Sequence, residues 1–118
     1  MIKEVTIQIK AVFDLRKMIK PEWQIIHAPN EEVQNPRTVS KQMALGMCPG
    51  CPDLLLISPE GKSHFMEFKS ENGALDQAQR DFQLWAIRAN LPHSVVRSVS
   101  EAMKVFRFWG AIPEAAAG

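Results

Sequence analysis

Two strand-like segments joined by a short turn constrain the fold of this 118-residue chain more than any other feature. The segment Leu54–Ile57 is continuously apolar, as expected of a strand that is covered on both faces. A turn over Ser58–Gly61 follows, with a proline and a glycine, and leads into the segment Ser63–Lys69. The pattern predicts a β-hairpin.

The second segment of this hairpin carries charge on one face. Side chains alternate along a strand, so Phe65, Glu67 and Lys69 share one face. The other face carries the side chains at positions 64, 66 and 68, which are His, Met and Phe. A glutamate and a lysine are therefore expected to point the same way.

The remaining segments alternate between helical and strand patterns. Val5, Ile7 and Ile9 alternate as in a strand. Val5, Ile9, Val12 and Ile19 instead keep helical spacing up to Pro21. We predict a helix, because a strand of about 16 residues would be unusually long. The other predicted elements are a strand over Trp23–His27, a helix from Thr38 to Leu45 that ends at Gly46, a helix from Leu75 to about Asn90, a strand over His93–Val96 and a helix opened by Ser98. This order predicts an α/β fold with a central mixed sheet flanked by helices.

Composition bounds the class of protein without identifying a partner. Residues 1–113 have the size and apolar content of one domain, and the short tail 114–118 is expected to be disordered. The chain has no apolar run of membrane-spanning length and no signal-peptide pattern, so we expect a cytoplasmic protein without a membrane partner. The net charge of +1 does not by itself indicate nucleic acid.

Three residues of the predicted hairpin suggest chemistry. Asp53 begins the first strand and Glu67 lies near the end of the second, so the turn returns both carboxylates to one end of the sheet. Two carboxylates suit Mg²⁺ or Mn²⁺, which prefer oxygen ligands. Lys69 lies on the same face as Glu67, where an ammonium could orient water and stabilise charge on a phosphate. The group predicts metal-dependent phosphodiester hydrolysis, with no organic cofactor.

Taken alone, each of these residues has an ordinary structural explanation. Aspartate after a turn often only starts a strand, and Glu67 with Lys69 could be a solvated charge pair. Further segments accompany the three residues in a fixed order. They are His27-Ala-Pro-Asn30, Gly46 followed by Pro49-Gly-Cys-Pro-Asp-Leu54, Glu67-Phe-Lys69, Gly73-Ala-Leu75 with Gln79, and Arg97-Ser-Val-Ser-Glu-Ala102.

This ordered set resembles the PD-(D/E)xK nucleases, and more closely their VRR-NUC branch, from about Glu4 to Trp109. The resemblance implies a restriction-endonuclease-like fold and a DNA endonuclease. It also implies that Asp53, Glu67 and the Phe68 backbone carbonyl bind the metal and that Lys69 assists the attacking water. Stand-alone members of this kind are typically phage proteins that act as homodimers on branched DNA such as Holliday junctions, which would place this chain in the host cytoplasm.

The resemblance adds two further candidates. Glu4 looks like the first-helix glutamate that approaches the metal in many relatives, and Gln79 like a residue that supports the active site. For Gln79 a structural role stays open, because Asp76-x-x-Gln79 has the spacing of a helix capping box.

Two other functions remain open from the sequence. The first is a non-catalytic DNA-binding or assembly protein with the same fold. The second is a small redox protein that uses Cys48 and Cys51, although C-x-x-C spacing in a loop is also compatible with simple loop packing. Basic residues could form a phosphate-contacting surface or a solvated helix face; they are Lys10, Arg16, Lys17, Lys20, Arg37 and Lys41.

Overall fold

The computed structural model describes residues 2–27, 41, 44–46 and 48–115. Most of the predicted helix that begins at Thr38 lies outside the described residues. The tail residues 116–118 lie outside them as well. The helices and strands follow the predicted order along the chain. They are α1 (Glu4–Met18), β1 (Gln24–His27), β2 (Leu54–Ile57), β3 (Ser63–Phe68), α3 (Gln77–Arg88), β4 (His93–Val96) and α4 (Val99–Trp109).

The four strands form one mixed sheet in the order β1-β2-β3-β4. β1 pairs antiparallel with β2, and β2 pairs antiparallel with β3, so the predicted hairpin is confirmed. β4 runs parallel to β3, with Phe68 in register with Val96. The fold is the α/β, restriction-endonuclease-like architecture that the sequence predicts.

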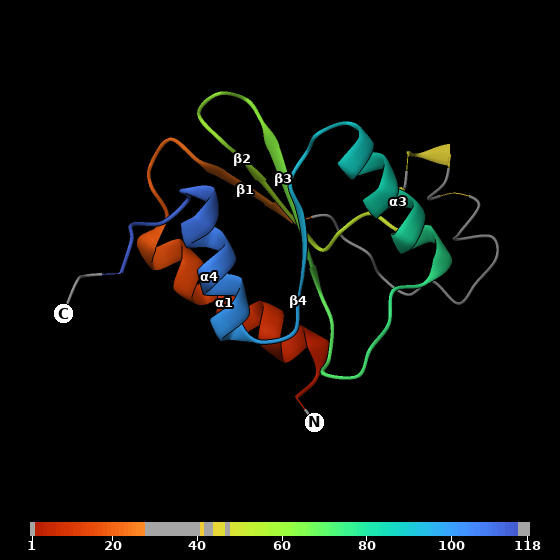
Figure 1. The fold of residues 1–118 in the computed structure, drawn as a ribbon, viewed down its shortest axis with the longest axis horizontal. Coiled ribbons are helices and arrows are strands. Elements are labelled where there is room, and N and C mark those ends of the chain that lie inside the picture. The colour runs from red at the N-terminus through yellow and green to blue at the C-terminus, as the bar shows by residue number, and fades with distance from the viewer. Residues whose placement is uncertain (1, 28–40, 42–43, 47, 116–118) are drawn as a thin grey trace.

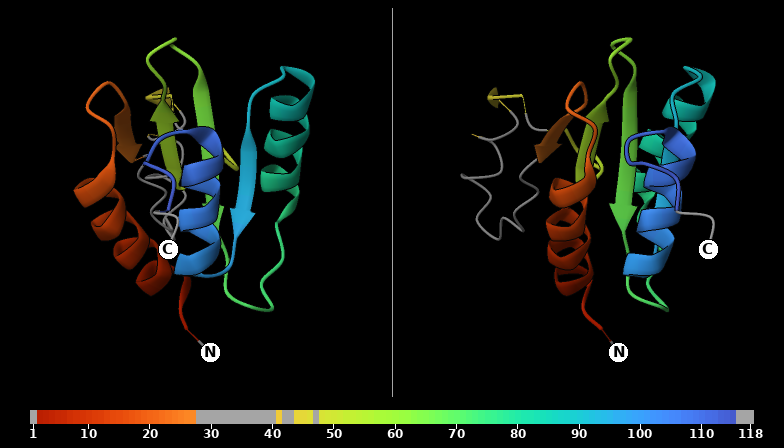
Figure 2. Two further views of the ribbon diagram at one scale, coloured as in Figure 1. Left: turned by 60° about the vertical axis from the view of Figure 1, so that its left-hand side comes forward. Right: turned by 90° about the vertical axis from the view of Figure 1, so that its left-hand side faces the viewer.

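Helices cover both faces of the sheet (Figures 1 and 2). α1 and α4 pack against each other on one face, and α3 covers the other face. In the sequence, α3 connects β3 to β4. Parallel neighbours need such a crossover, because the C-terminal end of the first strand and the N-terminal start of the next lie at opposite ends of the sheet. The core lies between the sheet and the α1–α4 pair, and its largest fully buried side chains are Phe68, Phe106, Leu15, Leu54, Leu56, Met66, Ile112 and Val96.

α1 is a helix, as predicted, but its buried face differs from the apolar spacing that suggested it. Ile7, Ala11 and Leu15 are buried against the core, whereas Val5 and Ile9 are 58% and 65% exposed. The helix carries two apolar stripes, and α4 and the sheet can cover only one of them. No helix within the described residues is long and apolar enough to cross a bilayer.

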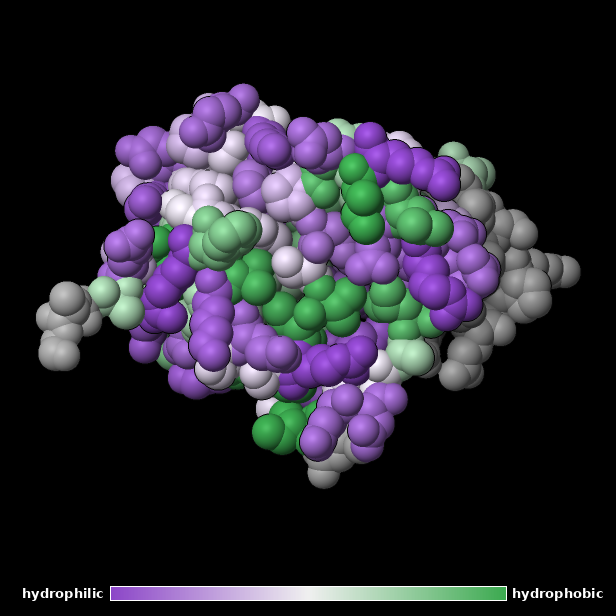
Figure 3. All heavy atoms as spheres, viewed as in Figure 1, coloured by the Kyte–Doolittle hydropathy of each residue, from purple (hydrophilic) through white to green (hydrophobic). Residues whose placement is uncertain are grey.

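Both C-terminal helices begin at the predicted caps. Asp76 and Gln79 form the reciprocal capping box of α3, and the Ser98 hydroxyl accepts a hydrogen bond from the Glu101 amide at 3.0 Å. Some aromatic side chains lie partly open to solvent. Trp85 contacts Phe65 and Phe82 yet is 52% exposed. Figure 3 shows hydrophobic side chains gathered over β4 between α3 and α4.

Candidate active site

Asp53 and Glu67 stand directly opposite each other at one end of the hairpin. The register pairs Leu54 with Met66, so the next pair along the two strands is Asp53 and Glu67. Ser58 donates its amide hydrogen to the Lys62 carbonyl, so these two residues form a hydrogen-bonded pair. Such pairs alternate along an antiparallel ladder, so positions 56, 54 and 52 are also hydrogen-bonded positions and 53 is not. Asp53 and Glu67 thus form a non-hydrogen-bonded pair, the kind whose side chains lie closest together.

At this end of the hairpin, Pro52 leaves the β-ladder without one backbone hydrogen-bond donor. In the same register it lies opposite Phe68, at a position where both backbone hydrogen bonds would normally form. Proline has no N–H, so it cannot donate to the Phe68 carbonyl. The Phe68 amide donates instead to Asp53 Oδ2 at 2.9 Å. Since the amide and carbonyl of one strand residue point the same way, the Phe68 carbonyl faces the side on which the Asp53 carboxylate lies.

Glu67 is an acidic side chain in a buried position, with only 3% of its surface exposed. Its Oε2 atom is buried and has no hydrogen-bond partner among the described residues. Burial, followed by the negative charge of Asp53 and by a hydrogen bond that the two carboxyl groups form when they share a proton, raises the pKa of Glu67 to about 9. Lys69 lowers this pKa, and Glu4 raises it further. Two carboxylates held this close favour either a proton or a cation between them.

Gln79 connects the capping box of α3 to this carboxylate. Its backbone amide donates to Asp76 Oδ1 at 2.8 Å, and its Oε1 accepts from the Asp76 amide at 2.9 Å. Its Nε2 donates to Glu67 Oε1 at 3.1 Å. The cap and the contact with the site use different atoms of one amide, so the two roles weighed from the sequence coexist.

Lys69 and Glu4 lie at the same edge of the sheet. Lys69 follows β3 and is half-buried, and its backbone amide donates to the Val96 carbonyl at 3.0 Å. The Glu4 carboxylate accepts a hydrogen bond from the Ser70 amide at 3.4 Å. Glu4 therefore reaches the segment after Lys69, and its negative charge is the smallest of the causes that raise the pKa of Glu67.

The carboxylate pair has the chemistry of a hard-cation site. Asp53 and Glu67 supply oxygen atoms, Glu67 Oε2 is buried without a partner, and Pro52 leaves the Phe68 carbonyl without its ladder donor. Mg²⁺ and Mn²⁺ are commonly held by one or two carboxylates together with water and substrate oxygens. Across residues 2–27, 41, 44–46 and 48–115, no three His, Cys, Asp or Glu side chains gather into a metal-binding group by themselves.

His27 is a neighbour of the site for which the sequence offered only a weak signal. Its Nδ1 lies 3.2 Å from the Asp53 carbonyl oxygen and 3.5 Å from Gln8 Nε2. A carbonyl only accepts and an amide Nε2 only donates, so Nδ1 hydrogen-bonds to Asp53 when it carries the proton and to Gln8 when it does not. β1 pairs with β2 so that His27 lies opposite Leu54, which explains why a residue far away in sequence reaches Asp53.

The loop with Cys48 and Cys51 packs against the start of α3. The Cys51 amide donates to the Cys48 carbonyl at 3.2 Å, and the two residues form no disulfide. A Cβ at Gly50 would lie 2.2 Å from the Ala78 backbone, and Gly50 also has a φ of +74°. Burial is the main cause that raises the Cys51 pKa to about 12, which does not favour a reactive thiolate.

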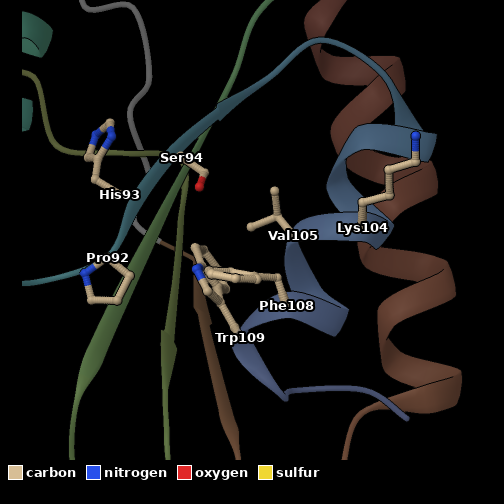
Figure 4. Close-up of a pocket in the computed structure, with 7 residues that line it drawn as sticks. All are labelled: Pro92, His93, Ser94, Lys104, Val105, Phe108 and Trp109. Atoms are coloured by element: carbon tan, nitrogen blue, oxygen red, sulfur yellow. The ribbon is translucent and has the colours of Figure 1, made fainter. Parts of the chain in front are cut away.

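A separate hollow lies between β4 and α4 and has a volume of about 390 Å³ (Figure 4). Phe108, Val105 and Trp109 line it together with Lys104 and His93. Its lining contains no carboxylate, and burial lowers the His93 pKa. The hollow therefore lacks the oxygen donors that distinguish the carboxylate pair.

Of the basic residues named above, two α1 lysines contact their own helix. Lys10 forms an ion pair with Asp14 at 3.0 Å, and Lys17 lies over the Phe13 ring at 4.1 Å. Lys41 is exposed, and Arg37 lies outside the described residues. Both lysines are exposed on the surface of α1.

One known protein family matches the segment that contains the carboxylate pair. The model of the VRR-NUC domain matches residues 22–100, which is more than half of the chain and includes the carboxylate pair, Lys69 and Gln79. This chain belongs to the VRR-NUC domain family. No curated protein and no solved structure gives a significant match. Membership in the VRR-NUC family assigns a nuclease-type, DNA-processing function, in a family that generally uses divalent metals.

Proposed function

We propose that this VRR-NUC protein is a Mg²⁺- or Mn²⁺-dependent endonuclease that hydrolyses phosphodiester bonds in branched DNA such as Holliday junctions. The observation that carries the proposal is the carboxylate pair itself. Glu67 is 3% exposed, lies opposite Asp53 and has an unpartnered buried oxygen. Such an arrangement is costly for stability unless a cation or a proton offsets it.

Each residue of the group has a separate role in the proposed reaction. Asp53, Glu67 and the Phe68 carbonyl would hold the cation, and Gln79 fixes the rotamer of Glu67 through its 3.1 Å hydrogen bond. When bound, the metal supplies Lewis acidity and a more acidic water. Lys69 places a positive charge on the same face, where it orients the attacking water and stabilises charge on the phosphate.

Glu4 has a supporting role in this proposal. Its carboxylate accepts from the Ser70 amide and lies within electrostatic range of Glu67. It can contribute to the negative field that attracts the cation, as expected of the first-helix glutamate that approaches the metal in many relatives.

The branched substrate and the homodimer rest on family likeness, with one supporting surface. α1 exposes an apolar stripe in which Val5, Ile9 and Phe13 are 58%, 65% and 54% exposed. Exposed apolar stripes of this kind often mark protein interfaces. A dimer would present two active sites to the two strands that must be cut at a junction.

A cleavage assay tests this proposal. Labelled four-way junction, flap and linear duplex are incubated with Mg²⁺ or Mn²⁺, with and without a chelator. We expect metal-dependent cutting of the junction, and a rate lowered by about 10²–10⁴-fold in Lys69→Ala. Lys62→Ala, which changes an exposed turn lysine, is the matched control and should cut normally. Absence of cutting with both metals, or normal cutting by Lys69→Ala, would show the proposal to be wrong.

A further inference from the structure

The turn that follows Lys69 is held by a side chain from another part of the chain. Arg97 Nη1 donates to the Ser70 carbonyl at 2.7 Å and to the Gly73 carbonyl at 2.6 Å. A longer contact of 3.4 Å joins the same nitrogen to the Glu71 carbonyl. Three carbonyl oxygens of one turn, residues 70–73, therefore converge on one guanidinium.

The topology explains why Arg97 reaches this turn. β3 and β4 are parallel, so their C-terminal ends lie at the same edge of the sheet, close to the start of α1 (Figure 1). The Lys69 amide donates to the Val96 carbonyl, and Arg97 is the next residue after Val96. The Lys69 backbone is consequently bound to β4, and the turn that follows it is bound to Arg97.

Arg97 is itself fixed in place from α4. Its backbone amide donates to Glu101 Oε1 at 2.7 Å. Glu101 in turn donates its amide hydrogen to the Ser98 hydroxyl, the N-cap of α4. The Glu101 side chain thus reaches Arg97, one residue before the N-cap, and orders the backbone from which the guanidinium extends.

The opposite side of the turn is occupied by a carboxylate and by a glycine that leaves room for it. Glu4 Oε1 accepts from the Ser70 amide at 3.4 Å. A Cβ at Gly73 would lie 3.0 Å from Ser70 Oγ and 3.3 Å from Glu4 Oε1. The turn thus binds a cation through its carbonyls and an anion through the Ser70 amide.

We propose that Arg97 is a positioning residue for Lys69. By binding the carbonyls of residues 70–73 it fixes the direction in which the chain leaves β3, and so keeps the Lys69 side chain on the face that carries Glu67. An exposed arginine near a nuclease site would ordinarily be assigned to a DNA phosphate. Here the described contacts of its guanidinium are all to backbone carbonyls. The role in catalysis rests on the proposed nuclease function, whereas the effect on Lys69 does not.

Two substitutions and one matched control test this role. Arg97→Ala removes the guanidinium, and Arg97→Lys keeps the charge but cannot present the planar set of donors. Arg88→Ala changes an exposed arginine in the last turn of α3 and should behave as wild type. We expect kcat on junction DNA to fall by about 10- to 100-fold in Arg97→Ala, because small misplacement of a catalytic group has effects of that size. The KM and the Kd for DNA should stay within about twofold of wild type. The kcat of Arg97→Lys should lie between those of wild type and Arg97→Ala.

A readout without cleavage separates this inference from the nuclease proposal. Amide hydrogen exchange of residues 70–73 should become faster in both Arg97 variants, and the NMR signal of the Lys69 ε-methylene should shift in both. If wild type cuts no DNA but these changes occur, the proposed function fails and the positioning of Lys69 stands. Unchanged exchange and an unchanged Lys69 signal would overturn the inference. A loss of DNA affinity equal to the loss of activity would also overturn it, because it would assign Arg97 to the substrate.

Discussion

The two faces of β3 contrast strongly although they belong to one strand of six residues. On one face Met66 and Phe68 are fully buried and pack in the core beneath α1 and α4. On the other face Phe65 packs on Phe82 of α3, and Glu67 is buried beside Asp53. The first face stabilises the fold through apolar burial. The second holds two carboxyl groups close together, an arrangement that lowers stability when both are ionised and no cation is bound.

The largest expected effect on stability belongs to the apolar face. Phe68→Ala removes a side chain with 0% exposure and should lower the free energy of unfolding by about 3–5 kcal/mol. Urea denaturation monitored by tryptophan fluorescence measures the loss. Phe108→Ala, at a side chain that is 89% exposed, should change stability by less than about 0.5 kcal/mol. Similar losses in the two variants would remove the distinction between core and surface aromatics.

The smaller effect belongs to Glu67, and it depends on pH. The pKa of Glu67 is raised to about 9 in the folded protein, so the folded state holds the proton more tightly than the unfolded state. The stability that protonated Glu67 contributes is fully present below the ordinary pKa of a glutamate and is lost as pH rises through about 9. In chelator, wild type should therefore lose stability between pH 7 and 8.5, by no more than about 1.4 kcal/mol per pH unit.

Glu67→Gln removes this titration, so its free energy of unfolding should stay nearly constant over the same window. His64 and His93 do not disturb the comparison, because burial lowers the pKa of each below its ordinary value. Glu60→Gln, at an exposed turn residue, should keep the wild-type slope. An equal slope in wild type and Glu67→Gln would mean that Glu67 is ionised normally and that the two carboxylates do not compete.

Local patterns were sufficient to predict the hairpin, the order of the helices and strands, and the capping-box spacing of Asp76 and Gln79. Each depends on residues close together in sequence, where alternation and turn chemistry are decisive. The opposition of Asp53 and Glu67 also followed, because a short turn fixes the register of both strands. The residue roles of the candidate site remain predictions that the experiments above address.

Contacts between distant segments could not be predicted in the same way. Helical spacing in α1 did not show that Ile7 and Leu15 would be buried while Ile9 stayed open, since both stripes are apolar. The contact of His27 with Asp53 depends on the pairing of β1 with β2. Arg97 reaches residues 70–73 only because β4 runs parallel to β3. Each case is decided by packing geometry that no local pattern contains.

The central claim is that Asp53 and Glu67 form a divalent-cation site, and calorimetric titration with Mn²⁺ tests it most directly. Wild type should bind Mn²⁺, and Asp53→Asn and Glu67→Gln should each weaken the affinity by at least about tenfold, since even indirect neighbours of a metal contribute 10–100-fold. Glu60→Gln should bind as wild type does. Wild type that binds no Mn²⁺, or Glu67→Gln that binds it with unchanged affinity, would contradict the claim.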